Sequence, residues 1–155
     1  MSVPHPGAFL GALGSSDQAL RSGYMAFFQL PLLPAVALRG PVGRRALRRS
    51  GMESEAVARF QQEMVADGAL PGALGWYRAL PLSGPGARRP VRVPTTLVWS
   101  DGDTAVTRAA ARRCARHVAA PYSLVELPGV SHWIPDQAPG ELAAAVIDRI
   151  GSAER

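Results

Sequence analysis

Two residues of this sequence, Asp103 and His132, have the types and positions expected of an acid–base site. Asp103 ends the turn sequence Ser100-Asp101-Gly102-Asp103, which follows an apolar, β-branched run, Thr95–Trp99, typical of a buried strand. His132 comes 29 residues later, on the loop after the next predicted strand. Functional side chains gather at the carboxyl ends of parallel strands, and both residues fall there. Because imidazole gives and takes protons near neutral pH, we interpret the pair as catalytic.

Each of these residues also has a purely structural interpretation. Asp101-Gly102-Asp103 is a sequence typical of a strand-ending turn, and a histidine three residues after Gly129 can be an ordinary loop residue. Asp101 is a second, weaker candidate for the acid. A strand that follows Val93-Pro94 precedes Asp103, and a turn at Pro128-Gly129 precedes His132. The two features together favour the catalytic interpretation.

The elements that must position the pair are two strands and two helices. They are a strand at 95–99, a helix at 108–118 capped by Thr107, a strand at 122–127 ended by Pro128-Gly129, and a helix from Pro139 with Leu142, Val146 and Ile150 on one face. This alternation predicts an α/β fold with a parallel sheet. Two strands would leave both faces and an edge of such a sheet uncovered, so we expect part of the sheet to be missing.

Helices and Gly/Pro breaks, without a convincing strand, characterise residues 1–86. The predicted elements are a helix at 19–30 stopped by Pro31 and Pro34, a helix from a Ser50/Glu53 capping box to Gly68, a short helix at 72–80, and a loop at 81–90. His117 is expected to cap a helix end, whereas His5, between two prolines, has no evident partner.

The two loops around Asp103 and His132 resemble those of the α/β-hydrolase superfamily, which carries an acid and a histidine after its last two strands. The resemblance implies that Asp103 orients the imidazole and that His132 is the general base. With a serine nucleophile, His132 would deprotonate the hydroxyl. With an aspartate nucleophile, it would activate the water that hydrolyses the ester intermediate. The sequence leaves both chemistries open.

The helical half resembles the cap of epoxide hydrolases in two segments, 22–31 and 73–78. In that family two tyrosines donate hydrogen bonds to the epoxide oxygen, which implies this role for Tyr24 and Tyr77. Phe27, Phe28 and Trp76 would be pocket wall or cap core, and Trp133 would also line the pocket of a small apolar substrate. Alternatively, both tyrosines are merely buried amphipathic aromatics. Esterases and haloalkane dehalogenases share parts of this layout and remain alternatives.

A nucleophile is missing from the pattern. The sequence has no Gly-x-(Ser, Asp or Cys)-x-Gly elbow, since the two Gly-x-x-x-Gly stretches centre on Phe9 and Leu70, and it has no His-Gly-x-Pro oxyanion loop. We therefore expect a C-terminal fragment: residues 1–11 end a core strand and enter the cap, 12–86 form the cap, and 87–155 complete the core. We expect no turnover by this chain alone.

The charge of +5 does not indicate a nucleic-acid partner. All 17 basic residues are arginines, and neither the cluster at 44–49 nor that at 88–92 is interleaved with aromatic residues. We interpret both clusters as solvated surface.

The remaining features exclude other classes of protein. Cys114 is the single cysteine, so an internal disulfide is excluded and a cytoplasmic location is expected. The sequence has no signal peptide and no membrane-length apolar run. No metal or cofactor is expected. A complementary N-terminal half, or a second copy of the chain, is a possible partner for the open sheet edge, in which case the chain would be a non-catalytic binding remnant.

Overall fold

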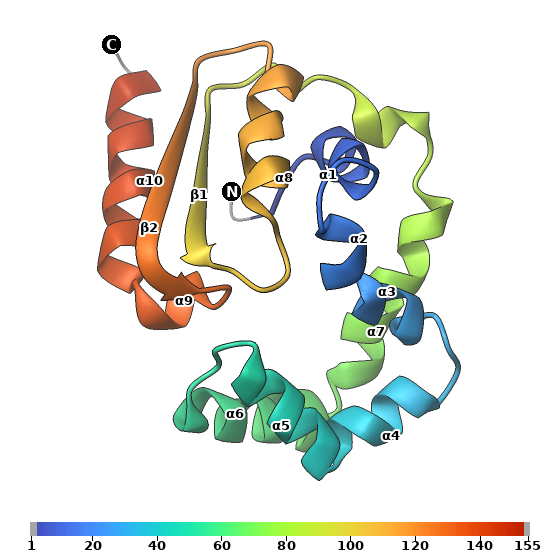
Figure 1. The fold of residues 1–155 in the computed structure, drawn as a ribbon. Coiled ribbons are helices and arrows are strands. Elements are labelled where there is room, and N and C mark those ends of the chain that lie inside the picture. The colour runs from blue at the N-terminus through green and yellow to red at the C-terminus, as the bar shows by residue number, and fades with distance from the viewer. Residues whose placement is uncertain (1–2, 154–155) are drawn as a thin grey trace. The chain divides into compact units, whose positions relative to one another are not determined.

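The computed structural model describes residues 3–153, and its contacts divide the chain into two units. One unit combines Met1–Arg21 with Pro85–Arg155, and the other is Ser22–Gly84 (Figure 1). The described residues do not include 1–2 and 154–155. These four residues are the outer ends of the expected ranges 1–11 and 87–155. The second unit is narrower than the expected cap range 12–86, because Ala12 packs in the core of the first unit.

The first unit contains the two strands and the helices around them. Its elements are α1 (Pro6–Leu13), α2 (Gln18–Arg21), a 3-10 turn (Pro85–Arg88), β1 (Thr95–Gly102), α8 (Arg108–Arg113), a 3-10 turn (Cys114–His117), β2 (Tyr122–Ser131), α9 (Ile134–Gln137) and α10 (Pro139–Ala153). The order strand, helix, strand, helix agrees with the expected α/β class. The chain is helical from Pro6 to Leu13, and the expectation that residues 1–11 end a core strand and enter the cap stays a prediction.

The parallel pair β1 and β2 forms a two-stranded sheet with helices on both faces (Figure 1). Leu97 and Trp99 of β1 pack with buried residues of α1 and α8, whereas Val98, which points to the opposite face, packs with Ile134 and Ala138. The expectation of two uncovered faces is therefore wrong: α1 and α8 cover one face, and α9 and α10 pack on the other.

His5 holds the start of α1, a role that the sequence did not indicate. Its Nδ1 accepts a hydrogen bond from the Gly7 N–H at 3.0 Å, and its Nε2 lies 3.0 Å from the Arg89 carbonyl oxygen. The imidazole also stacks on that of His117, with ring centroids 4.6 Å apart. Burial, followed by the charges of His5 and Arg116, lowers the pKa of His117. The two histidines thus tie α1 to the segment after α8.

The second unit consists of short helices. They are α3 (Gly23–Phe28), α4 (Leu33–Arg39), α5 (Pro41–Arg49), α6 (Ser54–Phe60), a π-helical turn (Gln61–Ala66), α7 (Leu70–Ala79) and a 3-10 turn (Leu80–Leu82). Its most buried apolar residues include Val57, Leu70 and Leu74. The arginine cluster at 44–49 lies on α5, where Arg44, Arg45 and Arg48 are exposed, as expected for solvated surface.

Several predicted helices are shorter than the sequence patterns indicated. The helix expected at 19–30 is interrupted between α2 and α3, and Pro34 lies in the first turn of α4 rather than ending a helix. Gly68 adopts a φ of +85°, which is consistent with its predicted role as a stop. The longest helix, α10, has 15 residues. No helix between residues 3 and 153 is long and apolar enough to span a membrane.

Tyr122, at the start of β2, is expected to destabilise the folded chain through its hydroxyl group. Its hydroxyl is buried without a hydrogen-bond partner among the described residues, and burial, followed by the nearby Cys114, raises the pKa of Tyr122 to about 12. Because an unsatisfied buried polar group costs about 1–3 kcal/mol, Tyr122→Phe should raise the free energy of unfolding by about 1 kcal/mol in urea titrations.

The matched control for Tyr122→Phe removes a hydroxyl that does have a partner. Thr107 Oγ1 accepts a hydrogen bond from the Ala110 N–H at 3.1 Å and caps α8. Thr107→Val should therefore lower the free energy of unfolding by about 1 kcal/mol. Equal losses in both variants would show that the Tyr122 hydroxyl is satisfied after all.

Candidate active site

A bulge in β2 brings the loop of His132 beside the end of β1. Ser100 pairs with Leu127 and Gly102 pairs with Ser131, so four residues of β2 span the same length as two of β1. Gly129 occupies the bulge with a φ of +71°, a conformation that favours glycine. The strand therefore continues past Pro128-Gly129 to Ser131, and the expectation that it ends at Leu127 is wrong.

Gly102 is required for the close approach of the two strands at the bulge. A Cβ atom at this position would lie 2.6 Å from the Val130 carbonyl oxygen, closer than real contacts allow. The neighbouring Ser100 hydroxyl donates a hydrogen bond to the Ser131 carbonyl at 2.7 Å. Asp101, the weaker candidate for the acid, accepts a hydrogen bond from the Gly129 N–H at 2.7 Å and so supports the bulge.

Asp103 is the carboxylate that the structure brings to His132. Its Oδ2 lies 2.9 Å from His132 Nδ1, while its Oδ1 accepts hydrogen bonds from the N–H groups of Ala105 at 2.7 Å and Val106 at 2.8 Å. Asp103 is only 2% exposed. Because a carboxylate only accepts hydrogen bonds, Nδ1 must be the donor, and the neutral imidazole keeps its lone pair on Nε2. This arrangement makes Nε2 the atom that can take a proton.

The backbone beside His132 is held by side chains that sequence reasoning missed. Gln137 Oε1, on α9, accepts a hydrogen bond from the Ser131 N–H at 2.9 Å, and the Ser131 hydroxyl accepts one from the Trp133 N–H at 3.2 Å. The Trp133 ring meets the imidazole edge-on, with centroids 5.5 Å apart. No local pattern marked Gln137, because α9 was not predicted. The role of Trp133 as pocket wall stays a prediction.

In the second unit, α3 and α7 bring Tyr24 and Tyr77 together. Their ring centroids are 5.8 Å apart, and the Phe28 ring lies 5.4 Å from Tyr24 and 4.9 Å from Tyr77. Hydrogen bonds join the two helices: Gln29 Nε2 donates to the Tyr77 carbonyl at 2.8 Å, and Arg78 Nε donates to that of Phe28 at 3.2 Å. The proposed roles of these tyrosines stay predictions.

The other two aromatic residues expected at the cap differ in burial. Phe27 is 37% exposed and its ring lies 6.0 Å from that of Phe28. Trp76 is 79% exposed, so the suggestion that it forms part of the cap core is wrong. A place in the wall of a substrate pocket stays a prediction for both residues.

Clusters of metal-binding side chains are absent from the described residues. Between residues 3 and 153, no three His, Cys, Asp or Glu side chains come together in a group that could hold a metal ion.

Cys114 is buried, and burial raises the pKa of its thiol, which makes it a poor nucleophile. Its Sγ accepts a hydrogen bond from the His5 N–H at 3.2 Å.

Comparisons with known proteins assign the chain to a family, although no family model matches it. The sequence is 30% identical to Epoxide hydrolase 3 of Xenopus tropicalis over 96% of this chain and 44% of that protein. It is also 30% identical to the AB hydrolase superfamily protein YfhM of Bacillus subtilis, over 96% of this chain and 54% of that protein. The chain belongs to the α/β-hydrolase superfamily. It spans about half the length of the curated relatives it matches.

Solved structures confirm the α/β-hydrolase fold. An epoxide hydrolase from Bacillus megaterium in complex with an inhibitor superposes with a TM-score of 0.70 at 18% identity, over 97% of this chain and 58% of that one. Epoxide Hydrolase A from Mycobacterium thermoresistibile gives 0.69 at 21% identity, over 96% and 58%. These structures confirm the fold class expected from the sequence, and the family rests on the sequence relatives above.

Gly102→Ala is expected to disrupt the approach of β1 to the bulge in this α/β-hydrolase chain. The added methyl group would push against the Val130 carbonyl, and such overpacking costs about 1–3 kcal/mol of unfolding free energy, measurable by urea denaturation. Gly140→Ala in α10 is the control, because its Cβ would meet no atom within 4 Å. A Gly102→Ala variant as stable as the control would contradict this interpretation.

Asp103→Asn is expected to change which nitrogen of His132 carries the proton. The asparagine amide can donate to Nδ1, so the neutral ring would hold its proton on Nε2 instead. Imidazole 15N chemical shifts at about pH 8, where an ordinary histidine is neutral, distinguish the two tautomers. Asp101→Asn is the control and should leave the spectrum of His132 unchanged, whereas an equal response to both variants would argue against the Asp103 contact.

Proposed function

We propose that this chain carries the acid–histidine pair and the cap tyrosines of an enzyme that hydrolyses small apolar epoxides. The observation that carries the proposal is the 2.9 Å contact between Asp103 Oδ2 and His132 Nδ1, with Oδ1 already occupied by two backbone N–H groups. The relatives named epoxide hydrolase support the choice of substrate. The roles below follow from the resemblance to that family.

The reaction has two steps in which this chain supplies proton donors and a base. An aspartate carboxylate attacks an epoxide carbon, the C–O bond breaks, and the alkoxide is stabilised by hydrogen bonds from the phenols of Tyr24 and Tyr77. The alkoxide takes a proton from one of these phenols, which regains a proton from water. His132 Nε2 then accepts a proton from water, whose oxygen attacks the ester carbonyl. The C–O bond between the carbonyl carbon and the diol oxygen breaks, and that oxygen takes the proton back from the His132 imidazolium. The products are a diol and the regenerated carboxylate. Asp103 stabilises the imidazolium that forms on His132.

The nucleophile of this reaction comes, in our proposal, from outside the 155 residues. The sequence contains no Gly-x-(Ser, Asp or Cys)-x-Gly elbow. The chain alone should then give no diol from styrene oxide. The same chain fused to the part of the Bacillus megaterium epoxide hydrolase that it does not cover should give diol, measured by chromatography.

Variants of the fused protein test the assigned roles. His132→Gln should block only the second step, so that mass spectrometry detects protein carrying the added mass of one epoxide. Tyr24→Phe and Tyr77→Phe should each lower kcat on epoxides roughly 100- to 1,000-fold, the usual effect of losing one oxyanion donor. Tyr122→Phe is the matched control and should leave kcat unchanged.

The outcomes separate epoxide hydrolysis from its alternatives within the superfamily. Hydrolysis of 4-nitrophenyl esters that is insensitive to both cap tyrosine variants would indicate an esterase. Halide release from 1-bromobutane would indicate a haloalkane dehalogenase. Diol formation by the unfused chain would overturn the proposal that the nucleophile lies outside it.

A further inference from the structure

The loop that carries Asp103 is held by a side chain from a distant part of the sequence. Gln18, on α2, is fully buried, and both ends of its amide contact this loop. Oε1 accepts a hydrogen bond from the Thr107 N–H at 2.9 Å, and Nε2 donates to the Ala105 carbonyl at 2.7 Å. The amide therefore matches one donor and one acceptor of the loop backbone, which fixes its orientation.

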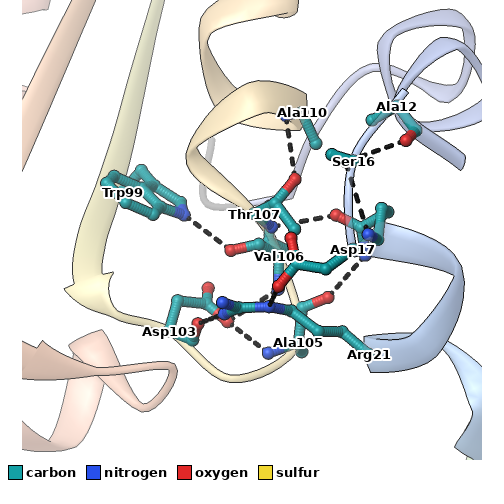
Figure 2. A network of polar contacts seen from close by, with 11 residues as sticks. Ala12, Ser16, Asp17, Arg21, Trp99, Asp103, Ala105, Val106, Thr107 and Ala110 are labelled. Atoms are coloured by element: carbon teal, nitrogen blue, oxygen red, sulfur yellow. Dashed lines mark hydrogen bonds and ion pairs between the residues drawn. The ribbon is translucent and has the colours of Figure 1, made fainter.

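A second residue of the same helix contacts the loop one turn later. Arg21 Nη1 donates a hydrogen bond to the Asp103 carbonyl at 2.6 Å, and Arg21 Nε lies 2.8 Å from Asp17 Oδ2 (Figure 2). The hydrogen bond from Arg21 lowers the pKa of Asp17, which is consistent with an ion pair that orients the guanidinium. Helix α2 thus contacts the backbone at residues 103, 105 and 107.

Within the loop, the remaining polar groups leave the backbone little freedom. Trp99 Nε1 donates to the Val106 carbonyl at 3.1 Å, and the Thr107 hydroxyl caps α8 through the Ala110 N–H (Figure 2). The N–H groups of Ala105 and Val106 bind Asp103 Oδ1. A displacement of residues 105–107 would therefore rotate the carboxylate and move Oδ2 away from His132.

We propose that Gln18, assisted by Arg21, is a positioning residue that sets the direction of the Asp103 carboxylate toward His132. Gln18 contacts the loop backbone at Ala105 and Thr107. It therefore acts through those two residues, whose neighbouring N–H groups hold Oδ1. The consequence for catalysis rests on the proposed function, but the effect on the tautomer of His132 does not require turnover.

The test uses the 155-residue chain and the imidazole 15N spectrum of His132 at about pH 8. Gln18→Met keeps the length of the side chain and removes both hydrogen bonds, so we expect loss of the single Nδ1–H tautomer while cooperative unfolding is retained. Gln18→Glu keeps the acceptor for Thr107 but loses the donor to Ala105, and should have a partial effect. Gln61→Met is the matched control, since Gln61 Nε2 donates to the Leu38 carbonyl at 3.1 Å in the other unit.

Arg21→Met tests the same contact at a residue that is not buried. The Arg21 side chain is 36% exposed, so its loss should leave the chain folded while it removes the contact with the Asp103 carbonyl. We expect a smaller shift toward mixed tautomers than in Gln18→Met. If Gln18→Met and Gln18→Glu do not fold and Arg21→Met leaves the spectrum unchanged, Gln18 is only a structural residue and the proposal fails.

The remaining outcomes separate this inference from the proposed function. A fixed Nδ1–H tautomer in the wild-type chain that persists in a folded Gln18→Met variant overturns the positioning role alone. A wild-type chain without that tautomer contradicts the acid–histidine pair itself, and with it the proposed function. An effect of Gln61→Met equal to that of Gln18→Met would show that the spectrum reports only general destabilisation, which also overturns the inference.

Discussion

The bulged parallel pairing of β1 with β2 is the constraint on which the candidate site depends. If the pairing continued in the register of Ser100 with Leu127, Gly102 would pair with Gly129, and the bulge instead brings Ser131 opposite Gly102. The pairing succeeds because Gly102 has no side chain where the Val130 carbonyl passes. Asp103 and His132, which follow these paired residues directly, are brought within hydrogen-bond distance by the strands rather than by flexible loops.

Burial destabilises the charged form of Asp103 unless its oxygens accept hydrogen bonds, and these hydrogen bonds fix the orientation of the carboxylate. A charged group removed from water is stable only when its lone pairs are used, and here two backbone N–H groups and one imidazole use them. Because Oδ1 is occupied within its own loop, Oδ2 is left for His132. The backbone of the loop is also hydrogen-bonded, because Gln18, Arg21 and Trp99 bind its carbonyl and N–H groups.

The second unit contains no strand, so its five short α-helices and two helical turns must be held together by side-chain contacts alone. The cluster of Tyr24, Phe28 and Tyr77 joins α3 to α7 through edge-to-face ring contacts, and side-chain amide and guanidinium groups bridge the same helices. Both phenols therefore belong to one packed cluster. Proline at the starts of α4, α5 and α7 favours many short helices over a few long ones.

The sequence by itself determined the α/β class, the strand that precedes Asp103 and the cap at Thr107, because these follow from patterns among near neighbours. It also indicated the pairing of an acid with His132, 29 residues away, through the positions of both residues after predicted strands and the resemblance to the α/β-hydrolase superfamily. Only the tertiary structure decided that β2 continues through a bulge, that His5 stacks on His117 and that Gln18 and Gln137 hold the two loops. Buried polar groups must find partners, and packing brings those partners together from positions more than 80 residues apart for Gln18. Short-range sequence patterns carry no record of such distant contacts.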